Sequence, residues 1–142
     1  MKFIIEGKPK PLLRPYYSKI SIFDRSKKDK YDFAIQCNFY KPKELLKGPL
    51  SLELRFYMPR PKNHFRSGKF SHLLKDLTLE RLYHIKVPDL SNLIKFVEDA
   101  LVGSFYEDDR QIIEIKAVKL YCNKKGPRTE IDLRMISNVK NF

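Results

Sequence analysis

Residues 82–121 constrain the fold of this chain most, because they predict a helix between two strands. From residue 90 onward, apolar residues recur at the three- and four-residue spacing of one helix face, namely Leu93, Phe96, Val97, Ala100 and Leu101. Gly103 ends this helix. The run Leu82–Val87 before it is strand-like and is closed by Pro88, and Gln111–Tyr121 after it alternates as a strand. The pattern therefore predicts a βαβ unit over residues 82–121, whose two strands we expect to be neighbours in one sheet.

The rest of the chain completes an α+β pattern, a mixed sheet flanked by helices. Further strands are predicted at Lys2–Glu6, Tyr16–Phe23, Leu50–Met58 and Thr129–Ile136, and a further helix is predicted from Asp29 to about Tyr40. Residues 59–81 scatter basic side chains among Pro, Ser and Gly, which indicates a mobile basic loop with a candidate helix at 73–79. A length of 142 residues favours a single domain spanning 1–142.

Several classes of protein are excluded by composition. The two cysteines, Cys37 and Cys122, lie far apart without CxxC spacing, so neither a disulfide framework nor a zinc finger is expected. The apolar run at the start of the chain stops at Glu6, which argues against a signal peptide. No stretch approaches the ~20 apolar residues of a membrane span. We therefore expect a reduced, cytoplasmic protein with no membrane partner.

The charge of the chain is unevenly distributed. There are 29 Lys and Arg residues against 17 Asp and Glu, a formal charge of +12. A strongly basic domain is typical of nucleic-acid-binding proteins, although a net charge of either sign also keeps a protein in solution. Residues 89–114 nevertheless hold seven acidic and only two basic residues, so this segment carries −5 and the remainder carries +17. Residues 89–114 are therefore an acidic segment within an otherwise strongly basic chain.

Three aspartates in this acidic segment are candidate metal ligands. Asp89 lies between the predicted strand and helix, and Asp108 and Asp109 lie in the loop before the next strand, so we expect them at the same edge of the sheet. Their hard oxygens suit Mg²⁺, which keeps several waters and fills its coordination sphere with substrate phosphate. Lys95 is placed to stabilise charge on the phosphorus or to protonate the leaving oxygen. This combination predicts metal-dependent phosphodiester hydrolysis at this edge of the sheet.

Each of these features also has an ordinary structural interpretation. Asp89 fits a helix N-cap, residues 107–109 fit a solvated turn, and Lys95 with Asp99 fits a helical i,i+4 pair. The pair Tyr16 and Tyr17 fits either the core or a platform on which bases stack. The three histidines are scattered, and metal binding by them is not expected.

At these residues the chain resembles the RusA family of Holliday-junction resolvases, small basic endodeoxyribonucleases often carried by prophages. The resemblance rests on four segments: GKPKPLLRP from Gly7 to Pro15, HIKVPDLSNLIK from His84 to Lys95, DALVG from Asp99 to Gly103, and DDRQI from Asp108 to Ile112. Together they extend over nearly the whole chain, and the spacing from 84 to 112 is specific.

The resemblance implies a RusA-like fold and a homodimer with one metal site per subunit. It implies metal-ligand roles for Asp89 and Asp109, with Asp108 beside it, and a catalytic role for Lys95. The expected cofactor is Mg²⁺, with Mn²⁺ as a substitute, and no small-molecule cofactor is expected. Such enzymes cut two opposed strands of a four-way junction, and a junction of two-fold symmetry calls for a two-fold enzyme.

Ser91 departs from the family pattern. RusA proteins usually carry a second aspartate at this position, two residues after the first, and a hydroxyl is a neutral and weaker ligand than a carboxylate. Glu98, Asp99 or Glu107 could compensate, or the site could use fewer direct ligands and more water. Otherwise metal affinity would fall and catalysis would be slow or lost.

We therefore expect a Mg²⁺-dependent endonuclease that resolves four-way DNA junctions in recombination and repair. Arg14, Lys86, Asn92 and the 60–75 loop are candidate DNA contacts. We expect the protein at the nucleoid, encoded by a chromosome, a phage or a prophage. Two alternatives remain: a branched-DNA-binding protein whose nuclease is weakened or lost through Ser91, and a basic structural or ribosome-associated protein with an acidic turn.

Overall fold

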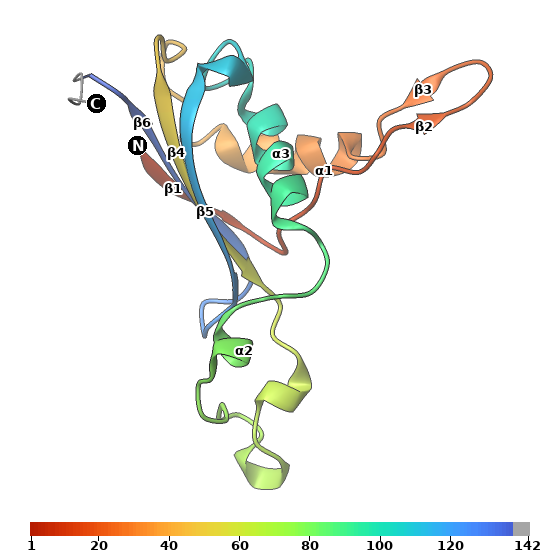
Figure 1. Ribbon diagram of the computed structural model, residues 1–142, viewed down its shortest axis with the longest axis vertical. Helices are drawn as coiled ribbons and strands as arrows, with labels where there is room; N and C mark the ends of the chain where they lie inside the picture. The colour runs from red at the N-terminus through yellow and green to blue at the C-terminus, as the bar shows by residue number, and fades with distance from the viewer. Residues whose placement is uncertain (138–142) are drawn as a thin grey trace.

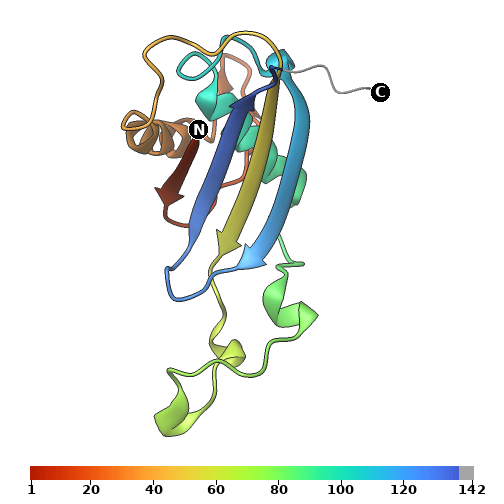
Figure 2. The same cartoon turned by 90° about the vertical axis from the view of Figure 1, so that its left-hand side faces the viewer.

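The protein is built on a four-stranded mixed sheet with the strand order β1-β6-β4-β5. A computed structural model describes residues 1–137. Strands β1 (Lys2–Glu6) and β4 (Leu50–Met58) are both antiparallel to β6 (Arg128–Met135), whereas β4 and β5 (Ile112–Tyr121) run parallel. Helices α1 (Lys27–Cys37) and α3 (Leu90–Leu101) lie on one face of the sheet (Figure 1), and no helix within residues 1–137 covers the other, bare face (Figure 2). The predicted α+β class, with a mixed sheet flanked by helices, is confirmed.

The central strand β4 forms the middle of the core. Its side chains alternate, and those that point toward the helices are almost fully buried: Leu50, Leu52, Leu54, Phe56 and Met58. The helix side of the core comes from the apolar face of α3, as its spacing predicts. Phe96 on α3 meets Phe33 on α1 edge to face, with ring centroids 5.5 Å apart. Burial of each such side chain stabilises the fold by about 1.5–3 kcal/mol, so α3 is held firmly on the sheet.

The predicted parallel crossover is present, but its first strand is β4 and not residues 82–87. Its first residue, Leu82, ends a single turn of helix, α2 (Leu79–Leu82), and the run makes only one bridge to the sheet, between Tyr83 and Leu120. Ile85 and Val87 are 79 % and 82 % exposed, so their alternation does not face a core. The chain has to leave the sheet here to reach α3 on its covered face, and Pro88 has no N–H to donate to a ladder. The connection from β4 to α3 therefore runs through residues 59–89 as a lobe beyond the end of the sheet (Figure 1), with 3₁₀ turns η1 (Lys62–His64) and η2 (Gly68–Phe70).

Two other element predictions need correction. The predicted strand Tyr16–Phe23 is a hairpin of two short strands, β2 (Tyr16–Tyr17) and β3 (Ile22–Phe23), because Ser18 and Ser21 turn the chain between them. The candidate helix at 73–79 is not formed, because Leu74 forms a bridge with Phe65 instead. The predicted helix Asp29–Tyr40 is present as α1, two residues earlier at its start and three at its end. The strands predicted at 2–6 and 50–58 are confirmed to the residue.

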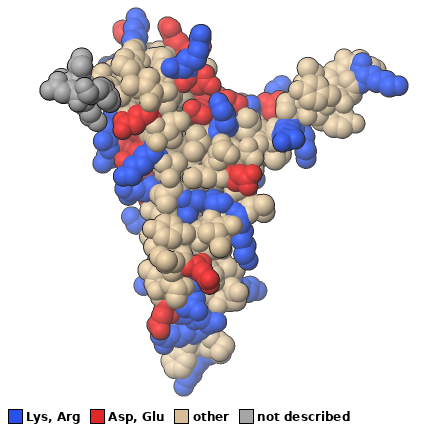
Figure 3. All heavy atoms as spheres, in the orientation of Figure 1, with Lys and Arg blue, Asp and Glu red and all other residues tan. Residues whose placement is uncertain are grey.

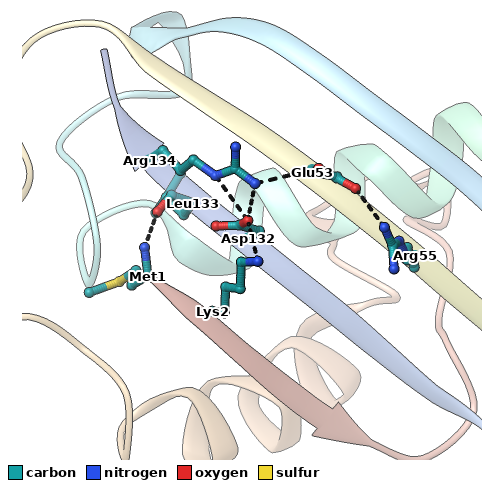
Figure 4. A network of polar contacts seen from close by, with 7 residues as sticks. All are labelled: Met1, Lys2, Glu53, Arg55, Asp132, Leu133 and Arg134. Carbon is teal, nitrogen blue, oxygen red and sulfur yellow. Dashed lines mark hydrogen bonds and ion pairs between the residues drawn. The ribbon is translucent and has the colours of Figure 1, made fainter. Parts of the chain in front are cut away.

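The bare face of the sheet carries a ladder of alternating charges (Figure 4). Asp132 on β6 accepts from Arg134 and lies 3.6 Å from Lys2, while Glu53 on β4 pairs with Arg134 and with Arg55. Charged side chains are well hydrated, and these also pair with one another, so this face of the sheet can be in contact with solvent. Within residues 1–137, no helix is long and apolar enough to cross a membrane.

Candidate active site

Asp89 occupies the N-cap position of α3, yet its side chain does not cap the helix. The residue is extended, with φ −66° and ψ 142°, and only its backbone carbonyl accepts from Leu93. Its exposed carboxylate accepts no hydrogen bond from the first turn. Asp89 is therefore the N-cap residue by position, as the structural interpretation expects, but its carboxylate does not cap the helix.

Lys95 connects α3 to the loop that precedes β5. Its Nζ lies 3.7 Å from Oε2 of Glu98 on the same helix and 3.8 Å from Oδ2 of Asp109. The expected pairing of Lys95 with Asp99 is replaced by these two contacts, and Asp99 instead lies 3.9 Å from Lys30 of α1. Two residues predicted to act together, Lys95 and Asp109, are thus brought into contact across segments that are separate in the sequence.

Glu98 is the buried carboxylate of this group. It is only 6 % exposed, and burial raises its pKa above the usual range of a glutamate, against the opposing effect of Lys95. Asp109 and Asp99 raise the pKa of Glu98 further because their negative charges are close. The hydroxyl of Tyr106 donates to the backbone carbonyl of Glu98 at 3.0 Å and fixes this turn of the helix. Burial of the Glu98 carboxylate costs part of its hydration free energy, and a nearby cation would offset that cost.

Asp108 holds the loop in place. Its side chain accepts from the backbone N–H of Arg110 at 2.8 Å and from the Arg110 guanidinium at both oxygens, as the cap of a short turn, η3 (Asp109–Gln111). These bonds to Arg110 keep the pKa of Asp108 well below its usual range. Gln111 closes the capping box and donates to the carbonyls of Leu46 and Gly48, next to β4. The turn interpretation is therefore correct for Asp108, whereas Asp109 faces Lys95.

Lys119 is the site residue that the sequence did not reveal. It lies on the covered face of β5, where it pairs in register with the buried Phe56. Its Nζ donates to the carbonyls of Lys86 and Pro88 at 2.5 and 2.6 Å, so it holds the segment that leads into Asp89. Burial lowers the pKa of Lys119 and the charge of Asp89 raises it. The only signal in the sequence is a lysine on the inward alternation of a strand, beside Ala117 and Tyr121.

The remaining predicted residues lie on the surface around this centre. Ser91 and Asn92 are exposed in the first turn of α3, Lys86 is exposed just before Asp89, and Arg14 is exposed at the base of the β2–β3 hairpin. In the view of Figure 3, acidic side chains gather on the upper part of the body, and lysines and arginines lie around them and along the lower lobe. The uneven distribution of charge along the sequence therefore corresponds to an uneven distribution on the surface.

Comparison with known proteins assigns the family. A family model described as Endodeoxyribonuclease RusA matches residues 6–134. The chain belongs to the RusA family. The uncharacterized protein YqaN of Bacillus subtilis (strain 168) is 31 % identical over 143 residues, which cover 96 % of this chain and 97 % of the relative. RusA membership indicates an endodeoxyribonuclease and implies binding of branched DNA and resolution of Holliday junctions.

RusA nucleases generally depend on a divalent metal, and the donors of this chain suit one in kind. Asp89, Asp109 and Glu98 offer hard carboxylate oxygens, and the ammonium of Lys95 already lies near two of them. In the described part of the chain, however, no three His, Cys, Asp or Glu side chains are close enough together to enclose an ion. Asp89 and Asp109 do not lie at one edge of the sheet, as predicted from the sequence: Asp89 follows the segment held by Lys119 near the end of β5, whereas Asp109 directly precedes the start of β5. The oxygen donors therefore suit Mg²⁺ in kind, but the described residues do not bring three of them together.

Proposed function

We propose that this protein is a Mg²⁺-dependent endonuclease that resolves four-way DNA junctions by paired, symmetric nicks, in DNA recombination and repair. The observation that carries the proposal is the contact of Lys95 with Asp109 and Glu98, within a basic RusA-family chain whose Asp89 carboxylate makes no hydrogen bond to the helix that follows it. The basic surface attracts the phosphate backbone, and the acidic centre marks where a strand is cut.

Asp89 and Asp109 are the proposed metal ligands. Both oxygens of Asp108 are taken by Arg110, so we assign Asp108 to positioning the loop and Asp109 to binding the ion. A bound Mg²⁺ or Mn²⁺ supplies Lewis-acid polarisation of the scissile phosphate and a lowered pKa for the attacking water. Lys95 stabilises negative charge on the phosphoryl group or protonates the leaving oxygen, and its two carboxylate contacts hold it in place.

Glu98 is the proposed replacement for the carboxylate that Ser91 lacks. Of the three candidates, Asp99 points toward Lys30 of α1, and Glu107 is exposed in the turn. Glu98 alone is both buried and in contact with the Lys95–Asp109 pair. We therefore expect Glu98 to restore negative charge at the metal site, either as a ligand or through a bound water.

The test is cleavage of a labelled synthetic four-way junction with Mg²⁺, with Mn²⁺ and with EDTA. We expect nicks at matching positions in two opposed strands, only with metal. Asp89→Asn and Asp109→Asn should lose at least 100-fold in rate, whereas Glu114→Gln, an exposed carboxylate on β5, should cut normally. Absence of metal-dependent cleavage, or normal cleavage by Asp89→Asn, would refute the proposal. Salt-sensitive junction binding without cleavage would instead support a branched-DNA-binding protein weakened by Ser91.

The role of Glu98 has its own test. Glu98→Gln should raise the Mg²⁺ concentration needed for half-maximal cleavage about tenfold, in line with the effect of residues that support a metal site. Adding Ser91→Asp should restore the wild-type requirement, because it returns a carboxylate to the position two residues after Asp89. If Ser91→Asp improves metal affinity equally with and without Glu98→Gln, the two residues act independently and the assignment fails.

A further inference from the structure

The hairpin β2–β3 forms an arm, defined here as residues 14–25, that projects away from the body of the protein (Figure 1). Its base is braced at both strands: Leu13 donates to the buried Ser26 hydroxyl at 2.8 Å, and Ser26 donates to Asp24 at 2.9 Å. Asp24 is in turn paired with Lys30 of α1 at 2.6 Å. The arm is therefore attached in a defined direction, at the N-terminal end of α1.

The arm is apolar on both faces and at its tip. Tyr16 pairs across the hairpin with Phe23 on one face, and Tyr17 pairs with Ile22 on the other. Each of these four side chains is more than half exposed, and Ile20 at the tip is 96 % exposed. A two-stranded hairpin is only marginally stable by itself in water, and no other segment within residues 1–137 covers this one (Figure 1). An element with such a surface needs a partner that encloses it.

The helix next to the arm carries a matching apolar row. Tyr31, Ile35 and Phe39, at four-residue intervals along α1 and its C-terminal extension, are 67 %, 46 % and 86 % exposed. They are distinct from the buried face of α1, which contributes Phe33 and Cys37 to the core. Each subunit thus presents a projecting apolar arm and, next to it, an uncovered apolar helix row.

We propose that the arm of one subunit packs along the exposed row of α1 in a second copy of this chain, and that this exchange forms the homodimer. The contact is reciprocal, as two-fold symmetry requires, because each chain has both the arm and the row. The arm and row together expose eight large apolar side chains, and at about 100–150 Å² each these supply roughly the 800 Å² per subunit that a stable interface buries.

The distal part of the arm carries little charge to attract DNA. Its residues 15–23 contain one charged residue, Lys19, while the other charged residues of the arm, Arg14, Asp24 and Arg25, lie at its base. The 60–75 loop, in contrast, carries Arg60, Lys62, Arg66, Lys69 and Lys75 and has the composition of a phosphate-binding segment. The inference rests on the homodimer that the paired nicks of the proposed function call for, but not on nuclease activity itself.

The first test is the mass of the intact protein in solution by light scattering over a range of concentrations. We expect twice the 16.9 kDa of the chain for the wild type. Ile20→Ser with Ile22→Ser, and separately Ile35→Ser with Phe39→Ser, should raise the dimer dissociation constant at least 100-fold, with unchanged circular dichroism. Leu77→Ser, an equally exposed apolar residue in the 59–89 lobe, is the matched control and should remain dimeric. A monomeric wild type, or a dimer that survives both pairs of substitutions, overturns the proposal.

The second test asks whether arm and helix meet between subunits. Protein with Ile20→Cys is mixed with protein carrying Tyr31→Cys, Ile35→Cys or Phe39→Cys, and then mildly oxidised; the native cysteines are buried. A disulfide between the two different chains with at least one of the three positions supports the exchange. Cross-linking of Ile20→Cys only to itself overturns it, because the arms would then meet each other. Arm variants that stay dimeric but bind junctions weakly would assign the arm to DNA instead. None of these readouts requires cleavage, so failure of the nuclease proposal would be seen separately.

Discussion

Lys119→Met removes the side chain that fixes the approach to Asp89. The substitution keeps the length of the side chain and takes away two charge-assisted hydrogen bonds, to the carbonyls of Lys86 and Pro88. Such bonds contribute about 1.5–3 kcal/mol each, and burial of the ammonium, which lowers its pKa, opposes part of that gain. We expect a net loss of about 2 kcal/mol, or a melting temperature lower by roughly 6–8 °C for a chain of this size. Because the Asp89 carboxylate is then less well positioned, junction cleavage should fall a further ~10–100-fold, as for other residues that orient ligands.

The assay has two parts, urea unfolding and single-turnover junction cleavage at a temperature where all variants are folded. Lys116→Met is the matched control, because it makes the same change on the same strand at an exposed side chain on the bare face of the sheet. The control should unfold and cleave as the wild type does. If Lys119→Met is as stable as Lys116→Met and cleaves at the same rate, the two hydrogen bonds do not position Asp89 and the reasoning is wrong.

Three further predictions concern stability. Burial lowers the pKa of His84 below its ordinary 6.5, so the unfolded chain takes up this proton first and stability should decline as the pH falls below about 6.5; urea midpoints at pH 7.5 and 5.5 should differ less in His84→Phe. Phe96→Ala should cost about 3–5 kcal/mol in calorimetry, because it opens a cavity between α3 and α1, and Phe96→Leu should cost clearly less. Arg134 lowers the pKa of Asp132 below its ordinary 3.8. The Asp132–Arg134 ion pair therefore adds to the free energy of unfolding above that pH, and this contribution is lost as the carboxylate protonates. Asp132→Asn should therefore cost about 1 kcal/mol at pH 7, and the difference should vanish in acid.

The parts of the fold that the sequence predicted are those set by local periodicity and burial together. Helix 90–101 and strand 50–58 each bury one face against the same core, so their spacing reports their packing directly. The acidic segment and Lys95 were also predicted, since charge and motif spacing are visible without coordinates. The contact of Lys95 with Asp109 follows from the parallel crossover, which brings the C-terminal part of α3 close to the start of β5.

The parts that could not be predicted depend on what the chain meets in space. The alternation of residues 82–87 is the same as that of a strand, but β4 already occupies the parallel position beside β5. The hairpin at 16–23 is apolar enough to pass for a core strand, and only its direction away from the body shows that it is exposed. Glu98 reads as one polar residue of an amphipathic helix until its burial is known. Lys119 acts through backbone carbonyls, which no side-chain motif records.

Residues 59–89 connect β4 to α3 through a lobe outside the sheet. The shape of most of this lobe can therefore change independently of the residues that form the cutting centre. Residues 62–82 of the lobe lie ahead of the segment that Lys119 holds and that leads to Asp89, so their length and sequence can vary without altering β4, β5 or the helix that carries Lys95 (Figures 1 and 2). Lengthening such a connection costs little, about 0.6 kcal/mol for each doubling. Changes in this part of the lobe can therefore alter the preference of related chains for the shape of their substrate, while the residues of the cutting centre stay the same.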